Sequence, residues 1–165
     1  MPAGPLRETI TRLNEVDQVL VNGRFRQGAD SVSVVEQNAI EFELVATEVG
    51  RLNGSLTRPI GGFAGTTVHA VAAIGNPSRF FDLQRANDIQ VIEHAMPDHA
   101  SLSRKDLNFG DDFDILMTEK DAVKIGASAP DKLWKVPVEL NMDPLLAGPW
   151  LEQVESRMRN EQQNP

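Results

Sequence analysis

The spacing of hydrophobic and polar positions changes near residue 67 and divides the chain into two parts. Before that point, residues 5–13 (PLRETITRL) carry apolar side chains at helical spacing, which predicts a short helix. Residues 17–22 (DQVLVN) predict a strand, and residues 24–57 alternate turn residues with β-rich pieces, which predicts a small antiparallel ribbon. The glycine-rich stretch 58–67 (RPIGGFAGTT) has the composition of a junction between modules.

After the junction the pattern is strand, helix, strand, helix, strand, which is typical of a parallel sheet built from βαβ units. The mostly apolar residues 68–74 (VHAVAAI) predict a strand that is buried on both faces. A helix is expected over residues 77–86, with Asn76 as its cap and Pro77 at its first helical position. A second strand over residues 89–95 completes the first βαβ unit.

Two pairs of residues have the spacing of a capping box, in which side chain and backbone bond reciprocally at the start of a helix. Ser103 and Asp106 predict a weak helix, and Thr118 with Asp121 predicts a helix that begins directly after a third strand at residues 113–117 (FDILM). A last strand and a last helix are expected to close the domain, over residues 133–139 and 144–159. The sequence thus predicts an α/β fold in four segments: residues 1–23, 24–67, 68–159, and a disordered tail at 160–165.

Composition narrows the classes of function. The 165 residues include 16 Lys+Arg against 24 Asp+Glu, a net charge of −8, and this acidic balance argues against nucleic acid as a partner. The absence of cysteine excludes disulfides, thiolate metal sites and a cysteine nucleophile. Apolar runs are shorter than the ~18 residues that span a bilayer, and the N-terminus lacks the pattern of a signal peptide. We therefore expect a soluble, cytoplasmic chain.

The segment HAMPDH is the most suggestive cluster of reactive side chains, because it follows a strand where open α/β sheets place ligand sites. A metal could bind His94, Asp98 and His99 together with Asp111 or Asp112, although this spacing matches no zinc motif. His99 could instead act as an acid or base, since imidazole titrates near neutral pH. The alternative is a solvated loop histidine beside an aspartate that caps a turn.

The segment TEKDAVK is the densest charged motif in the chain. Its charges could contact a nucleotide or phosphate at a helix N-terminus. Alternatively they stabilise the helix itself, with Thr118 and Asp121 as the capping box, Glu119 in the first turn and Lys124 in the last.

The remaining signals do not complete a catalytic site. His69 lies inside an apolar strand and is expected to be a core residue or a contact between subdomains, and His94 is interpreted in the same way. No G-x-x-x-x-G-K-[ST] phosphate loop, dinucleotide fingerprint or G-x-S-x-G nucleophile elbow occurs in the chain. Function therefore stays open on these grounds.

Five segments occur in an order and spacing that resembles the tetraacyldisaccharide 4'-kinase family. They are PAGPLRE (2–8), VDQVLVNG (16–23), VHAVAAIGNPSRFF (68–81), PDH (97–99) and LMTEKDAVK (116–124). The resemblance implies ATP- and Mg²⁺-dependent transfer of the γ-phosphate to the 4'-hydroxyl of tetraacyldisaccharide 1-phosphate. The product would be lipid IVA, made at the cytoplasmic face of the inner membrane of Gram-negative bacteria.

In such P-loop kinases a larger N-terminal domain holds the phosphate loop, the metal ligands and an aspartate base, and a two-stranded ribbon joins it to a smaller C-terminal α/β domain. The resemblance makes residues 1–23 a remnant of the N-terminal domain, 24–67 the ribbon and 68–159 the C-terminal domain. The catalytic half would lie before Met1, so residues that bind ATP or Mg²⁺ are expected to be absent from this chain. We expect no kinase activity from the 165 residues alone.

By position in the family motif, His99 is the residue expected to pair with the catalytic aspartate and help it take the proton from the sugar hydroxyl. Asp98 could orient the His99 ring or cap the loop. The resemblance names the lipid A disaccharide precursor as substrate, with peripheral attachment to the membrane and a missing N-terminal half as possible partner. Self-association is expected too, because strand 17–22 would lose its neighbours. The alternative function is a non-catalytic binding module, or a relict that retains the C-terminal fold.

Overall fold

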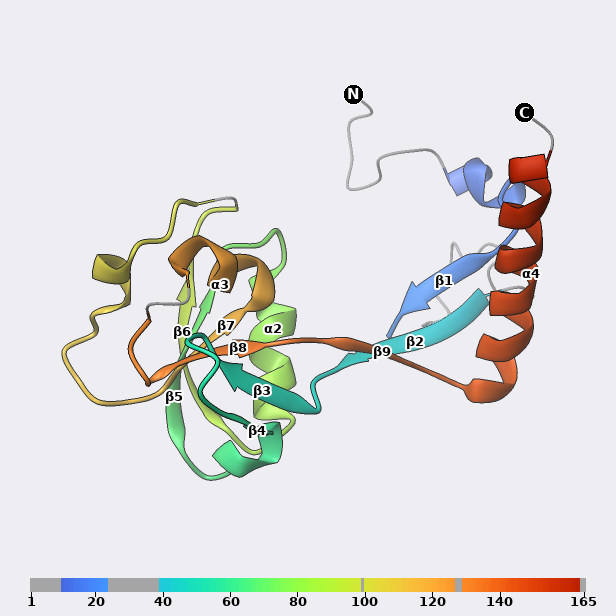
Figure 1. Ribbon diagram of the computed structural model, residues 1–165. Coiled ribbons are helices and arrows are strands. Elements are labelled where there is room, and N and C mark those ends of the chain that lie inside the picture. Colours follow the sequence, from blue (N-terminus) through green and yellow to red (C-terminus); the bar gives the residue numbers. More distant parts are fainter. Residues whose placement is uncertain (1–9, 24–38, 99, 127–128, 164–165) are drawn as a thin grey trace. The chain divides into compact units, whose positions relative to one another are not determined.

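The computed structural model describes residues 10–23, 39–98, 100–126 and 129–163. The chain divides into two compact units (Figure 1): unit 1 comprises Met1–Leu44 and Leu140–Pro165, and unit 2 comprises Val45–Glu139. The chain therefore leaves unit 1 once and returns to it. This division differs from the sequence-based boundaries in two places. The segment 24–67 is divided between the two units at residue 45, and the last helix belongs to unit 1.

Unit 2 is built on a six-stranded sheet in the order β4-β3-β8-β7-β5-β6. The pairs β5–β6, β5–β7 and β7–β8 are parallel, whereas β3 pairs antiparallel with both β8 and β4. The predicted α/β fold with a parallel sheet is confirmed, and an antiparallel hairpin extends that sheet on one side. Its strands are β3 (Glu48–Arg51), β4 (Thr57–Pro59), β5 (Thr67–Ala72), β6 (Gln90–Ala95), β7 (Ile115–Thr118) and β8 (Leu133–Val136).

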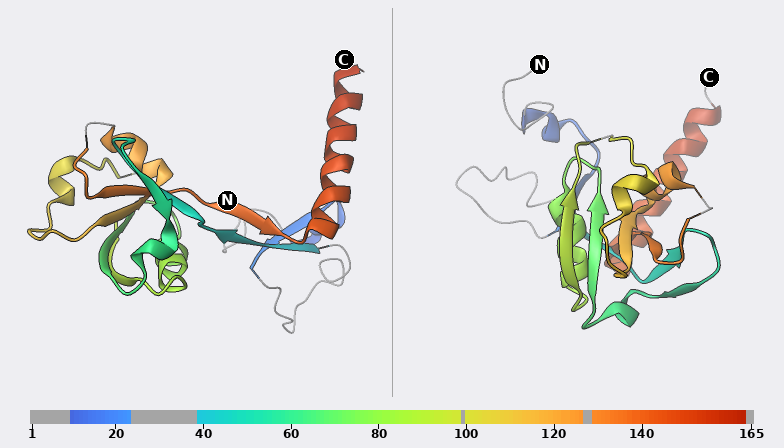
Figure 2. Two further views of the ribbon diagram at one scale, coloured as in Figure 1. Left: turned by 60° about the horizontal axis from the view of Figure 1, so that its bottom comes forward. Right: turned by 90° about the vertical axis from the view of Figure 1, so that its left-hand side faces the viewer.

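Helices cover both faces of this sheet (Figure 2). Helix α2 (Pro77–Arg85) packs Phe80 and Phe81 into a cluster with Val68 and alternate residues of β5. Helix α3 (Glu119–Ile125) and the 3-10 turn η3 (Arg104–Leu107) pack into a second cluster with Val71 and its alternates. Because successive strand residues point to opposite faces, β5 is buried on both sides, as its apolar run predicted.

The local signals of the sequence act as expected, with two exceptions. Pro77 begins α2, but Asn76 at its cap makes no capping hydrogen bond with its side chain among the described residues. The capping box of Ser103 and Asp106 forms at the start of η3. At the start of α3 only half of the predicted box is present: the Thr118 hydroxyl accepts the backbone N–H of Asp121, whereas the Asp121 carboxylate bonds other donors. A further 3-10 turn, η2 (Ile60–Phe63), lies between β4 and β5 within the glycine-rich stretch.

Unit 1 holds a three-stranded sheet in the order β1-β2-β9 and one long helix. Strand β1 pairs parallel with β2, from Val19↔Ala39 to Asn22↔Phe42. The expectation that residues 24–57 pair among themselves as an antiparallel ribbon is wrong for β2, because an alternating pattern identifies a strand but not its partner. The elements are η1 (Ile10–Asn14), β1 (Val19–Asn22), β2 (Ala39–Val45), β9 (Glu139–Met142) and α4 (Pro144–Gln163).

Helix α4 corrects two further expectations. It belongs to unit 1 and does not close the α/β domain. It also continues to Gln163, so most of the predicted tail at 160–165 is helical, as expected for glutamate and glutamine, which are good helix formers. Only the end of the helix predicted at 5–13 falls within the described residues, where η1 is a 3-10 turn. No described helix has the length and apolar character needed to cross a bilayer.

Candidate functional site

The candidate site lies at the carboxyl ends of β5, β7 and β6, where the TEKDAVK and HAMPDH segments emerge. Strand β5 lies between β7 and β6 in the sheet. The chain leaves β5 toward α2 on one face and leaves β7 toward α3 on the other face. This reversal is the topological switch point at which open α/β sheets place their ligands.

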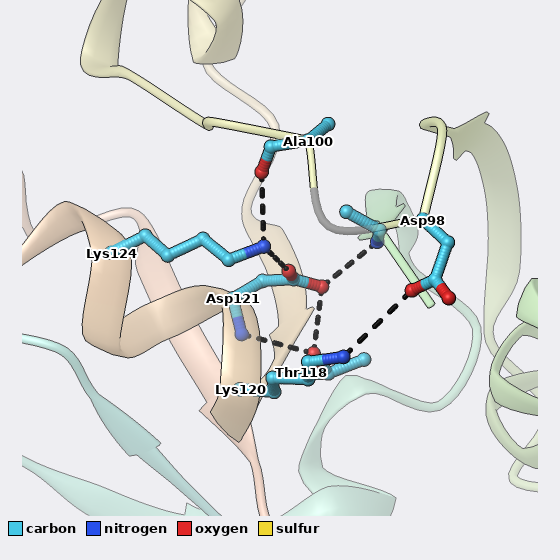
Figure 3. A network of polar contacts seen from close by, with 7 residues as sticks. Asp98, Ala100, Thr118, Lys120, Asp121 and Lys124 are labelled. Carbon is cyan, nitrogen blue, oxygen red and sulfur yellow. Dashed lines mark hydrogen bonds and ion pairs between the residues drawn. The ribbon is translucent and has the colours of Figure 1, made fainter. Parts of the chain in front are cut away.

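A buried carboxylate fills this switch point (Figure 3). Asp121 is fully buried and accepts hydrogen bonds from the backbone N–H of Ala73 at 2.9 Å and from the Thr118 hydroxyl at 2.7 Å. The ammonium group of Lys124 donates a third, at 2.9 Å. Burial by itself raises the pKa of a carboxyl group, but these donors together hold the pKa of Asp121 below its ordinary value. Asp121 is therefore ionised at neutral pH and ties the end of β5 to α3.

Helix α3 also contacts the loop that follows β6, on both sides of His99. Lys124 donates a hydrogen bond to the carbonyl oxygen of Ala100 at 3.0 Å, and Lys120 lies 3.8 Å from the Asp98 carboxylate. His99, the predicted catalytic residue, lies outside the described residues. Asp98, the second predicted residue, is half exposed and also approaches Gly75 in the turn after β5. The structure therefore brings Asp98 to the TEKDAVK helix.

The other two histidines form a separate cluster. His69 is buried, and its Nδ1 lies 2.9 Å from Nε2 of His94, while its Nε2 lies 2.9 Å from the Asp111 carboxylate. The ring of Phe109 stacks on His94 at a centroid distance of 3.9 Å. His69 is thus a hydrogen-bonded core residue, as predicted, and it connects β6 with the segment that precedes β7.

Two of the side chains that could bind a metal, His94 and Asp111, are paired with His69, because both lie within hydrogen-bond distance of its ring. Within the described ranges, no group of three or more histidine, aspartate or glutamate side chains is arranged to hold a metal ion. Burial, followed by the positive charge that His69 can carry, lowers the pKa of His94 despite the opposing Asp111 carboxylate. The cluster is therefore a structural link between two loops.

At the switch point, the described side chains of α3 are engaged in internal bonds and are not arranged around a site for the ATP and Mg²⁺ that the family resemblance implies. The sequence contains no phosphate loop. At the switch point the carboxylate of Asp121 already accepts three protein donors, and the ammonium of Lys124 is held by Asp121 and Ala100. The charges of TEKDAVK thus serve helix capping and contacts with the loop after β6.

The sequence indicated most residues of this network, but it did not indicate the distant residues to which Asp121 and Lys124 bond. The capping box indicated Thr118 and Asp121, and the resemblance indicated Asp98. Spacing along the chain carries no signal for the bonds of Asp121 to Ala73 and of Lys124 to Ala100, because these residues lie 48 and 24 positions apart.

Comparisons with known proteins agree with the resemblance. The family model for tetraacyldisaccharide-1-P 4'-kinase matches residues 1–156. A tetraacyldisaccharide 4'-kinase of Hahella chejuensis is 44% identical over 144 residues, which are 86% of this chain and 40% of that protein. The enzyme of the same name from Alkalilimnicola ehrlichii is 43% identical, with 87% and 41% covered. The one from Xanthomonas campestris is 39% identical over 152 residues, with 86% and 43% covered.

The match falls in the C-terminal part of these relatives, so the chain spans about two fifths of their length. Among solved structures, LpxK from Aquifex aeolicus, crystallised with ATP, aligns with a TM-score of 0.61 at 17% identity. The alignment covers 95% of this chain and 47% of LpxK, and it shows a shared fold. Because the family model matches almost the whole chain at sequence level, the chain belongs to the tetraacyldisaccharide 4'-kinase family.

Proposed function

We propose that this chain supplies the C-terminal part of a kinase that transfers the γ-phosphate of ATP to the 4'-hydroxyl of tetraacyldisaccharide 1-phosphate, giving lipid IVA. The observation that carries the proposal is the family match over residues 1–156, which includes every segment from which the resemblance was drawn. The relatives that it matches are named for this reaction. The substrate is then the lipid A disaccharide precursor, and the enzyme works at the cytoplasmic face of the inner membrane, bound peripherally.

The 165 residues do not transfer phosphate alone in this proposal. Phosphoryl transfer depends on positioning and on neutralising charge, which P-loop kinases achieve with a phosphate loop, its lysine and Mg²⁺. The sequence lacks that loop, and the carboxylate at the switch point is committed to internal bonds. ATP and Mg²⁺ would be held by the part of the family's enzymes that precedes the matched region.

His99 is the residue we assign to the reaction. Paired with an aspartate base of the N-terminal part, its imidazole would orient that carboxylate and help it accept the proton of the 4'-hydroxyl. Asp98 is assigned a supporting role in the same loop, since it lies next to His99 in the chain and is paired with Lys120 of α3.

A chimaeric enzyme tests the assignment. Residues 1–165 replace the matching region of the Hahella chejuensis relative, and transfer of labelled phosphate to the disaccharide is measured beside the 165-residue chain alone. We expect turnover by the chimaera and none by the chain alone. A folded chimaera that binds ATP but leaves the disaccharide unphosphorylated would contradict the proposal and favour a non-catalytic binding module. Turnover by the chain alone would contradict the proposal that the part preceding the matched region holds ATP and Mg²⁺.

The role of His99 is tested in the same chimaera. His99→Ala should lower kcat by about a hundredfold, the scale of a lost acid–base group, with little change in the KM for ATP. The matched control is Ser101→Ala, which removes an exposed side chain from the same loop and should leave both constants unchanged. An unchanged kcat in His99→Ala would remove His99 from the mechanism.

Self-association of the isolated chain is a further part of the proposal. Strand β1 has β2 as its neighbour and lies at the edge of its sheet. Leu145 and Leu151 of α4 are 83% and 49% exposed. Open strand edges and exposed apolar side chains both favour association. Sedimentation velocity over a range of concentrations should show a shift from monomer to larger species, whereas a single monomer throughout would contradict this expectation.

A further inference from the structure

Helix α3 presents two lysines one turn apart toward the loop after β6. Side chains four residues apart lie on the same side of a helix, so Lys120 and Lys124 reach the same loop (Figure 3). Lys120 pairs with Asp98, and Lys124 bonds the carbonyl oxygen of Ala100. These two contacts fall on the residues that directly precede and follow His99 in the chain.

The two contacts differ in strength. The Lys120–Asp98 pair is 3.8 Å long and about half exposed on both sides, and such pairs contribute little. Lys124 is only 25% exposed, and its ammonium lies 2.9 Å from the fully buried carboxylate of Asp121. The bond from Lys124 to Ala100 is therefore the stronger of the two contacts with the loop.

Asp121 makes the position of Lys124 depend on the sheet. Its carboxylate accepts the backbone N–H of Ala73, immediately after β5, and the hydroxyl of Thr118 at the end of β7. A carboxylate with donors from two neighbouring strands has little freedom to turn. The ammonium group bound to it is fixed as well, and so is the carbonyl of Ala100 that this ammonium contacts.

A backbone hydrogen bond forms a turn in the loop that Lys124 contacts. The N–H of Ala100 donates to the carbonyl oxygen of Pro97 at 2.9 Å, so Asp98 lies within a tight turn that Lys124 holds at its end. A capping role for TEKDAVK requires only Thr118 and Asp121. It does not explain why the lysine of the last turn bonds to a different loop.

We infer that Lys124, held in place by Asp121, is a positioning residue: it fixes Ala100 and the bond from Ala100 to Pro97, and so supports the loop whose His99 the proposed function assigns to phosphate transfer. The inference rests on the proposed function for the role of His99. The fixing of the turn does not rest on it. Lys124 acts through the loop and does not itself touch ATP or the lipid.

The chain offers a matched control in Lys132, which bonds the same β6–β7 segment nearer to its β7 end. Lys132 donates to the carbonyl oxygen of Asp111 at 2.6 Å, so it makes the same kind of bond to the segment before β7. Lys124→Met and Lys132→Met each remove one lysine bond to a carbonyl oxygen in the segment that connects β6 to β7. Only the first touches the turn that contains His99.

The first measurement uses the 165-residue chain and needs no activity. Amide hydrogen exchange followed by NMR should show the Ala100 amide exchanging about tenfold faster in Lys124→Met, because the turn opens locally, while Lys132→Met leaves it unchanged. Should Lys124→Met fail to fold, Lys124→Gln takes its place. Unchanged exchange at Ala100 in a folded variant would overturn the inference.

The second measurement uses the chimaeric kinase. Misplacing a reacting group costs about tenfold to a hundredfold in rate, so Lys124→Met should lower kcat by that factor with the KM for ATP unchanged. Lys124→Arg should restore part of it, and Lys132→Met should match the parent. An unchanged kcat in Lys124→Met would overturn the link to catalysis. An inactive parent chimaera would overturn the proposed function instead, and the exchange measurement would still decide whether Lys124 fixes the turn.

Discussion

Gln84, on helix α2, is fully buried although its side chain is a polar amide. Neither its oxygen nor its nitrogen has a hydrogen-bond partner within the described part of the chain. A buried amide without partners loses its hydrogen bonds to water and forms none within the protein, so its burial costs free energy. The residue therefore reduces the stability of unit 2.

Replacing Gln84 by methionine keeps the volume and removes the polar atoms, so it should stabilise the chain by about 1 kcal/mol. Urea unfolding followed by circular dichroism measures this difference. The matched control is Gln153→Met at an exposed position of α4, which should change stability by less than about 0.5 kcal/mol. A loss of stability in Gln84→Met would show that the amide has a partner, such as a bound water.

His94 makes stability depend on pH in the range where histidine titrates. Its pKa is lowered in the folded state by burial and by the neighbouring His69, with Asp111 opposing. The unfolded chain, with the ordinary histidine pKa of about 6.5, therefore binds more protons than the folded chain as pH falls through that range. Stability is greatest above the unfolded pKa and is lost as pH decreases toward the folded pKa.

We expect the urea midpoint to fall between pH 7 and pH 5, and the fall to be smaller in His94→Gln, which cannot titrate. The Asp121 carboxylate, whose pKa is also lowered, acts in the same direction at lower pH, since protonation would break its bonds with Ala73 and Lys124. Equal slopes for His94→Gln and the parent chain between pH 7 and pH 5 would contradict the assignment to His94.

At the scale of elements, α2 is held to the sheet mainly by two aromatic side chains on its inner face. Phe80 and Phe81 are buried against the even-numbered residues of β5, and Leu83 packs beside them. Helix α2 is nine residues long, and helices of that length are marginal without tertiary packing. The first βαβ unit therefore depends on this contact.

Phe81→Ala should cost about 3–5 kcal/mol, because it removes a buried ring and leaves a cavity. The loss is measured by thermal or urea unfolding, with Arg79→Ala on the exposed face of the same helix as control. A loss below about 1 kcal/mol would mean that α2 is not packed on β5 in this way.

At the scale of the whole molecule, the two units have very different cores. Every member of the two buried apolar clusters belongs to residues 45–139. Within the described residues of unit 1, Ile40 is the sole apolar side chain that is buried. Burial of apolar surface is the main favourable term in folding, so unit 2 should carry most of the stability.

The fragment 45–139 is accordingly expected to fold by itself. It should give dispersed NMR amide signals and a single cooperative unfolding transition at a midpoint close to that of the whole chain. Hydrogen exchange in the whole chain should be slow in β5 and β7 and fast in β1 and β2. A fragment without cooperative unfolding would show that unit 1 contributes to the core of unit 2.

The sequence by itself determined the elements whose signals are local. The apolar run at 68–74, the proline that starts α2 and the Thr118 cap of α3 each depend on residues within one or two turns, so strand, helix and cap could all be predicted. The family was equally a property of sequence, since it depends on segments in register. The lack of a phosphate-loop motif predicted that the chain's own residues hold no complete kinase site.

The tertiary structure decided which distant segments meet. An alternating pattern indicates which face of a strand is buried, but it does not indicate which strand lies beside it. Only the fold pairs β2 with β1 and β9, and only the fold places α4 in unit 1. The same holds for the site. Lys124 signals a helix end in the sequence, but its bond to Ala100 exists because the sheet order brings the loop after β6 beside α3.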